Sequence, residues 1–223
     1  MLDPDLVSII KRLAFAFVPL MLGIILHEVA HGWMANRRGD PTAALMGRLT
    51  LNPVPHVDPV GLLFFVLTSI FGPVVLGWAK PVPINPRNFR NVTADILAVS
   101  LAGPVTNFLL ALISAGLLKV FLFLLPYHTW YTVPSWQFFL LMLYASITIN
   151  CSLAWFNLMP IPPLDGSKVA WSLMPPRLGY RFMQLERYGL LIVFALMFVG
   201  VFRFVLTPLV NGTTQLILTL FGL

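Results

Sequence analysis

The stretch Leu26-His27-Glu28-Val29-Ala30-His31 places three ionisable side chains inside an apolar run that begins at Leu13. Residues four apart lie on one face of a helix, so His27 and His31 can direct both imidazole groups at one point, with Glu28 beside them. This pattern, HExxH, is typical of a zinc site in which the carboxylate accepts a proton from water at an open coordination position. An unpaired charge at mid-bilayer costs about 2.5–3.5 kcal/mol, so a bound metal ion explains these residues better than hydrogen bonds within a helix bundle.

The composition indicates an all-α polytopic membrane protein. The chain of 223 residues is 58% hydrophobic and only 10% charged, whereas about 25% of the residues of an average soluble protein are charged. We expect a single integral-membrane domain, residues 1–223, in contact with membrane lipid. The net charge of +6 comes from basic residues that lie between the apolar runs. These basic residues indicate which loops face the cytoplasm, and no nucleic-acid partner is expected.

Five hydrophobic segments are long enough to be considered as spans. They are Leu13–Met34, Gly61–Trp78, Ile96–Leu125, Gln137–Leu158 and Leu190–Leu209. The second contains Gly72-Pro73 and reads either as a broken span or as a hairpin. Arg37, Arg38 and Gly39 are a helix-stop signal after the first segment. The proline-broken stretch that follows, Asp40–Pro59, predicts a re-entrant or short β-like segment.

Lys and Arg predict the orientation of the loops. The segments Lys80–Arg90 and Lys168–Arg187 should face the cytoplasm, and the aromatic loop Pro126–Trp136 should face away from it. The three arginines of the segment Arg37–Pro59 fit this scheme only if Gly61–Trp78 re-enters and does not span. The single cysteine, Cys151, lies in an apolar segment and is expected to be a small packing residue.

A catalytic zinc ion needs a third protein ligand, and a carboxylate oxygen is a usual choice beside two histidines. Most acidic residues, Asp40 among them, read as surface groups or neighbours of basic loops. Asp165 is the preferred candidate because prolines at 160, 162 and 163 hold it rigidly and Gly166 permits close backbone approach. The alternative is that Asp165 only caps the next helix.

Two further polar residues have open interpretations. Asn157 could donate a hydrogen bond to a developing oxyanion, or it could satisfy a backbone carbonyl group freed by the nearby prolines. His56, beside Asp58 in the irregular segment, is interpreted as a structural hydrogen-bonding group. A role as an alternative metal ligand or a proton shuttle stays open.

Three motifs together resemble the site-2 protease family of intramembrane zinc metalloproteases, and in particular its small bacterial members. They are HEVAH within an apolar span, the Gly-Pro-x-x-Asn segment of Gly103, Pro104 and Asn107, and the N-x-x-P-x-x-P-L-D-G segment of Asn157, Pro160, Pro163, Leu164, Asp165 and Gly166. The LNPxxHxDPxG segment at Leu51–Gly61 is also similar to these members. The resemblance covers the chain from about residue 20 to residue 170.

The resemblance implies a three-helix catalytic core with one Zn²⁺ per chain, held by His27, His31 and Asp165. It implies that Glu28 is the general base and that Asn157 lies toward the substrate carbonyl group. The expected substrate is a transmembrane helix of another membrane protein, and the expected location is the bacterial cytoplasmic membrane. No PDZ or CBS domain is expected. A zinc-binding membrane transporter and a non-catalytic scaffold that binds membrane helices are the alternatives.

Overall fold

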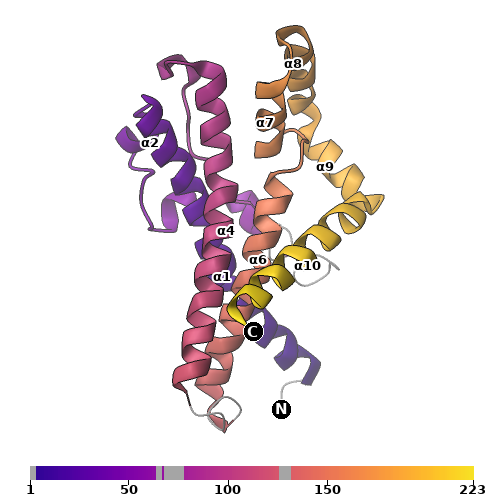
Figure 1. Ribbon diagram of the computed structural model, residues 1–223. Coiled ribbons are helices and arrows are strands. Elements are labelled where there is room, and N and C mark those ends of the chain that lie inside the picture. Colours follow the sequence, from indigo (N-terminus) through magenta and orange to yellow (C-terminus); the bar gives the residue numbers. More distant parts are fainter. Residues whose placement is uncertain (1–3, 64–66, 68–77, 126–131) are drawn as a thin grey trace.

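The computed structural model describes residues 4–63, 67, 78–125 and 132–223, with side chains from residue 14 onward. Its helices pack into a bundle in which α1, α4 and α6 form the central unit, and α10 lies across α6 (Figure 1). The described helices are α1 (Pro4–Arg38), α2 (Thr42–Leu45), η1 (Val54–His56), η2 (Pro86–Asn88), α4 (Val92–Leu124), α6 (Pro134–Asn157), α7 (Asp165–Leu173), α8 (Pro176–Met183), η3 (Gln184–Tyr188), α9 (Gly189–Phe198) and α10 (Val201–Phe221). The predicted all-α fold is confirmed.

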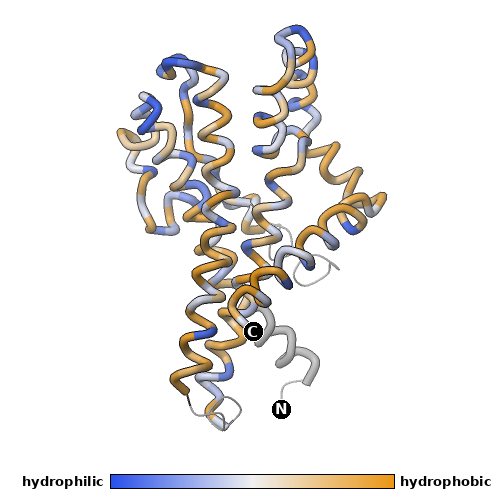
Figure 2. The backbone as a smooth tube through the Cα atoms, in the orientation of Figure 1, coloured by the Kyte–Doolittle hydropathy of each residue, from blue (hydrophilic) through white to orange (hydrophobic). Residues whose placement is uncertain are grey.

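Four of these helices are long and apolar enough to cross a membrane. The stretches are Ala14–Arg38, Val92–Leu124, Pro134–Asn157 and Val201–Phe221. Figure 2 shows that hydrophobic residues follow the central helices, while hydrophilic ones gather at the end of the molecule where α2 and α8 lie. The protein is therefore an integral membrane protein whose polar loops collect mainly at one end.

Small side chains allow the central helices to approach closely. Ala111 and Ala115 of α4 and Ile147 and Cys151 of α6 are fully buried in one core cluster. Small residues are favoured between membrane helices because lipid offers little hydrophobic drive for association, so close packing supplies the attraction. The prediction that Cys151 is a packing residue is confirmed, since its thiol is free and buried in this cluster.

Local signals fix the ends of α1 and α4. Gly39 has a φ of 109° and follows Arg37 and Arg38, so α1 stops where the sequence predicts. The side chain of Asn91 caps α4 by accepting a hydrogen bond from the backbone N–H of Ala94 at 3.2 Å. Asp95 in the first turn of α4 accepts from Asn91 N at 2.9 Å and pairs with Arg38 at 3.4 Å.

Most of the second apolar run, Gly61–Trp78, lies outside the described residues, but its two ends are described and they meet. Val57 pairs with Ala79 in an antiparallel bridge, and the backbone N–H of Lys80 donates to His56 O at 2.8 Å. The residues that precede the run therefore lie beside those that follow it. The segment before the run and the segment after it share one end of the bundle, which removes the conflict in the distribution of charge.

The last predicted span, Leu190–Leu209, is wrong. Gly200 has a φ of 82°, in the left-handed region, and it separates α9 from α10. With ten residues, α9 is about 15 Å long, half of what a bilayer core requires. The spanning helix is α10, which continues through polar residues to Phe221. One of these, Thr213, accepts a hydrogen bond from the Trp155 indole of α6 at 2.9 Å.

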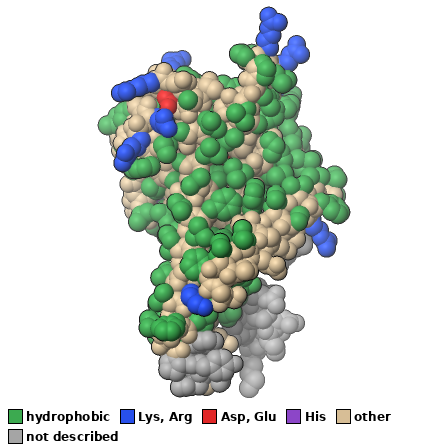
Figure 3. Space-filling model, viewed as in Figure 1, with side chains coloured by type: hydrophobic (Ala, Val, Ile, Leu, Met, Phe, Trp, Pro, Cys, Tyr) green, Lys and Arg blue, Asp and Glu red, His purple; other side chains and the backbone are tan. Residues whose placement is uncertain are grey.

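The basic residues gather where the sequence predicts. Lys and Arg side chains project from the end that carries the turn before α4 and from α8 (Figure 3). The segments from the end of α1 to the start of α4 and from α7 to η3 carry Arg37, Arg38, Arg87, Arg90, Lys168, Arg177, Arg181 and Arg187. The opposite end carries the connection between α4 and α6, whose residues 126–131 lie outside the described part of the chain. The positive-inside rule predicts that the basic end faces the cytoplasm.

Candidate metal centre

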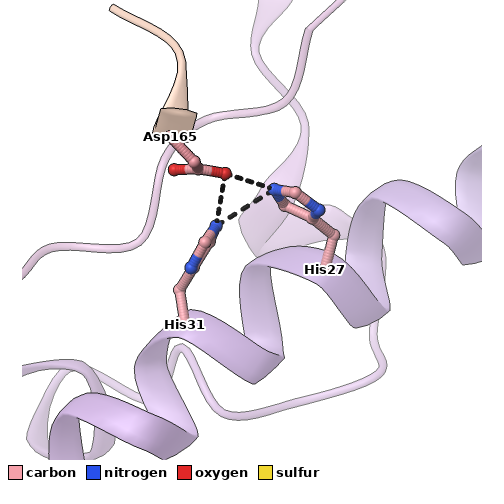
Figure 4. A group of neighbouring side chains, drawn as sticks. All are labelled: His27, His31 and Asp165. Atoms are coloured by element: carbon pink, nitrogen blue, oxygen red, sulfur yellow. Dashed lines mark hydrogen bonds and ion pairs between the residues drawn. The ribbon is translucent and has the colours of Figure 1, made fainter. Parts of the chain in front are cut away.

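His27, His31 and Asp165 converge on one point (Figure 4). The Nε2 atoms of the two imidazoles are 3.0 Å apart, and each lies 3.1 Å from Asp165 Oδ2. All three residues are buried. The two histidines lie one turn apart on α1, as the HExxH spacing predicts. Asp165 comes from the other half of the chain, at the first residue of α7.

The segment between α6 and α7 directs Asp165 at the histidines. α6 ends at Asn157, and the proline-rich turn that follows leads into α7. Asp165 does not cap this helix, because Leu164 occupies the N-cap position and no side chain forms a capping hydrogen bond. As a carboxylate, Asp165 presents the oxygen that a metal ion binds beside two imidazoles.

Hydrogen bonds on the far side of each ring determine which nitrogen is free. His31 Nδ1 lies 2.7 Å from the backbone oxygen of Val99, and His27 Nδ1 lies 2.6 Å from Asn107 Oδ1. Both oxygens are acceptors, so each Nδ1 carries the proton and each Nε2 presents a lone pair. Two lone pairs and a carboxylate oxygen within 3.1 Å of one another repel unless a cation lies among them.

This set of ligand atoms fits zinc. Tetrahedral coordination with bonds of about 2.0–2.2 Å keeps ligand atoms about 3.3–3.5 Å apart, close to the spacing observed here. Two imidazole nitrogens and one carboxylate oxygen leave a fourth position for water or substrate, which distinguishes catalytic from structural zinc sites. The far-side hydrogen bonds are those that usually hold metal-binding histidines in place.

α4 closes one side of the centre through a glycine. A Cβ atom at Gly103 would lie 2.5 Å from His27 Cε1 and 2.5 Å from His31 Nε2. Any side chain at this position would overlap the two imidazole rings, so the centre requires glycine here. The Gly-Pro-x-x-Asn segment thus supplies both this close approach and Asn107, the hydrogen-bond partner of His27.

Glu28 is held beside the centre by a backbone group. Its Oε2 atom accepts a hydrogen bond from the N–H of Val82 at 2.8 Å. Val82 lies in the segment after the second apolar run, and Arg48 fixes that segment by donating to Lys80 O at 2.7 Å. Among the described residues, no donor is within hydrogen-bond distance of Glu28 Oε1. The carboxylate is therefore oriented through one oxygen while the other is available.

A cavity of about 880 Å³ reaches the centre from the basic end. α1, α4, α7, α8 and residues 81–89 contribute to its wall, and His27, Glu28, His31 and Asp165 all line it. Asn157 also lines it, and its Nδ2 atom donates to Leu153 O at 3.0 Å on its own helix. This contact matches neither interpretation of Asn157, because no proline stands four residues after Leu153 and its carbonyl group is not one that the prolines free. The second amide hydrogen stays available to the cavity.

The structure agrees with the interpretation of His56 as a structural residue but not with the prediction for Asp40, in the segment after α1. His56 is buried and its Nε2 lies 2.9 Å from Thr50 O, a structural contact outside the metal-binding group. The prediction that Asp40 is a surface residue is wrong, since its side chain is fully buried.

Asp40 is buried because it joins two segments. It accepts hydrogen bonds from Thr42 N and Oγ1 at 3.1 and 2.5 Å, from Asn85 N at 2.6 Å and from Asn88 Nδ2 at 2.7 Å. Burial acts to raise its pKa, but these four donors outweigh burial and lower the pKa. Asp40 thereby connects the end of α1 to the loop that carries Val82.

The fold and the site define a class: a membrane protein with four candidate spans among its described residues and a buried His₂Asp group suited to a catalytic metal ion. The chain is 33% identical over 220 residues to "Putative zinc metalloprotease YwhC" of Bacillus subtilis, covering 96% of this chain and 93% of that protein. This chain belongs to the zinc metalloprotease family that includes YwhC.

More distant relatives carry the same description. "Putative zinc metalloprotease Rip2" of Mycolicibacterium smegmatis is 28% identical over 180 residues, covering 79% of this chain and 64% of that protein. Rip2 of Mycobacterium tuberculosis is 29% identical over 212 residues, covering 91% of this chain and 73% of that protein. No family model and no solved structure matches the chain.

Proposed function

We propose that this protein is an intramembrane zinc metalloprotease of the site-2 type, which hydrolyses peptide bonds within transmembrane helices of other proteins. The observation that carries the proposal is the His27–His31–Asp165 group, whose two histidines lie on the candidate spanning helix α1 and which opens to a cavity that Glu28 also lines. His31 precedes the end of α1 by seven residues, or about 10 Å along the helix. A substrate that reaches this depth is a membrane segment.

Zinc bound by His27, His31 and Asp165 would lower the pKa of a bound water and polarise the substrate carbonyl group. Glu28 Oε1 accepts the proton of the attacking water and later returns it to the leaving amine. The Val82 N–H keeps Glu28 in position for both transfers. The free amide hydrogen of Asn157 can donate to the oxygen that gains charge as the carbonyl group is attacked.

The substrate helix must unwind before it is cut, because helical carbonyl groups are hydrogen-bonded and shielded. Segments with Gly, Pro or Asn unwind at lower cost and are the expected substrates. The cavity supplies the volume for an unwound segment and for water. The bacterial relatives and the basic end of the molecule favour the bacterial cytoplasmic membrane as the location.

The test uses purified protein in liposomes with a tagged transmembrane reporter that contains a helix-destabilising pair of residues. We expect the wild type to cut the reporter, chelator to abolish cutting, and Glu28→Gln to keep zinc but not cut. Glu186→Gln is the matched control, because Glu186 is the other glutamate in the chain and is exposed on η3. If wild-type protein binds zinc but cuts none of several reporters, the proposal fails and a zinc-flux assay should follow.

A further inference from the structure

Two buried asparagines connect the metal centre to the interior of the bundle. Asn107 on α4 and Asn150 on α6 are fully and almost fully buried. Asn107 Nδ2 donates to Gly23 O at 3.1 Å and to Asn150 Oδ1 at 3.0 Å. Asn150 Nδ2 in turn donates to Ser146 O at 2.9 Å. A polar residue inside a membrane bundle is costly unless it is satisfied and has a role, and Asn150 contacts neither the cavity nor the metal-binding group.

We propose that Asn150 is a positioning residue: acting through Asn107, it determines which ring nitrogen of His27 is available to bind the metal. The proposal rests on the zinc centre proposed above and adds a set of residues that controls its affinity. The chain of contacts runs from Ser146 O through both amides to His27 Nδ1 and crosses three helices.

The direction of this chain follows from its two fixed ends. The oxygen and nitrogen ends of an amide have nearly the same shape, so only their partners decide how the group is oriented. Ser146 O and Gly23 O are backbone carbonyl oxygens and can only accept. The Nδ2 atom of each asparagine therefore faces a backbone oxygen, and Asn150 Oδ1 is the second acceptor that holds Asn107 Nδ2 in this orientation.

Once both amides are oriented, the remaining contacts are determined. Asn150 Oδ1 faces Asn107 Nδ2, and Asn107 Oδ1 faces His27 Nδ1 at 2.6 Å. His27 must then donate from Nδ1, which leaves the lone pair on Nε2 toward His31 and Asp165. If the Asn107 amide were reversed, its NH₂ group would select the opposite tautomer, with a hydrogen on Nε2 where the metal binds.

A purely structural role would also join the three helices, so the test separates the two roles. Asn107→Leu removes the acceptor for His27, whereas Asn107→Asp keeps an acceptor but loses both donated hydrogen bonds. Asn150→Leu leaves Asn107 with only Gly23 O to orient it. Ser152→Ala is the matched control, since Ser152 lies on the same helix as Asn150 and its hydroxyl donates to Thr148 O, apart from this chain of contacts.

Zinc affinity is measured by competition with a chromogenic chelator in detergent. Removing a hydrogen-bond partner of a metal ligand typically costs 10- to 100-fold in affinity. We expect a loss of about 100-fold for Asn107→Leu and about 10-fold for Asn150→Leu. Asn107→Asp and Ser152→Ala should stay within about threefold of wild type, because the former preserves the acceptor on His27.

The His27 tautomer is read separately, by nitrogen-15 NMR of the metal-free protein, whose four histidines make assignment by substitution practical. We expect Nδ1–H in wild type and a mixture of tautomers in Asn150→Leu. An unchanged tautomer and zinc affinity in Asn150→Leu would overturn the inference, as would equal zinc loss in Asn107→Asp and Asn107→Leu. Wild-type protein that binds no zinc while the tautomer shifts as expected would instead reject the proposed zinc enzyme.

Discussion

Gly103→Ala is expected to weaken zinc binding through one added methyl group. The new Cβ would lie 2.5 Å from His27 Cε1 and His31 Nε2 and 2.6 Å from His27 Nε2. These distances are about 1 Å shorter than normal contacts between carbon atoms. Without metal, the imidazole rings can turn away and relieve the overlap, whereas bound metal holds them in place.

The strain is therefore imposed mainly when zinc binds. Overpacking by one methyl group costs about 1–3 kcal/mol, and each 1.4 kcal/mol is a factor of ten in affinity. We expect zinc affinity to fall about 5- to 150-fold, while the apo protein unfolds at nearly the wild-type temperature. Chelator competition measures the affinity, and thermal unfolding of the apo protein measures stability.

Gly116→Ala is the matched control. Gly116 lies on the same helix, and a Cβ there would be 3.4 Å from Phe221 Cε1, an ordinary contact. A Gly103→Ala protein whose zinc affinity is within twofold of Gly116→Ala would refute the argument that the closeness of α4 to the imidazoles shapes the centre.

Two further predictions concern the loop that holds Glu28. Val82→Pro removes the N–H that donates to Glu28 Oε2, so we expect kcat to fall about 10- to 100-fold, the effect of losing one hydrogen bond to a charged group. The zinc content of Val82→Pro should be unchanged. Val82→Ala keeps the N–H and should retain activity. Equal kcat values for Val82→Pro and Val82→Ala would contradict the role of the Val82 N–H in holding Glu28. Asp40→Asn should lower thermal stability at neutral pH, because four donors hold the charged form of Asp40. Its folded pKa is lowered, so this stabilisation is present above the unfolded pKa of about 3.9 and is lost as pH falls through the folded pKa. The difference in unfolding temperature between wild type and Asp40→Asn should be constant from pH 7 to about pH 5 and should shrink as pH falls below about 3.9. A difference that is the same at pH 7 and at pH 3 would disprove the assignment.

The pairing of His27 and His31 could be predicted from the sequence because it depends only on the period of the helix. The helical repeat alone brings His27 and His31 together, since residues four apart share a face. Asp165 is 134 residues away from His31, and no local rule can connect them. Proline-rich surroundings left its role open between ligand and helix cap, and the family resemblance favoured the ligand.

The missed features depend on tertiary contacts. Asn150 stands in an apolar run, where its polar character signals a role but its partners on α1 and α4 cannot be read from spacing. Asp40 follows a helix-stop glycine and resembles an exposed residue, because its donors, Asn85 and Asn88, come from a distant loop. The final span was placed too early because hydropathy does not register the left-handed turn at Gly200.

The long separation between the ligands imposes an order on biosynthesis. α1 enters the membrane with His27 and His31 before Asp165 has been synthesised, and 138 residues separate His27 from its carboxylate partner. A ribosome-bound chain thus carries two thirds of the zinc ligand set without the third. The candidate metal centre is therefore complete only after α7 has packed against α4.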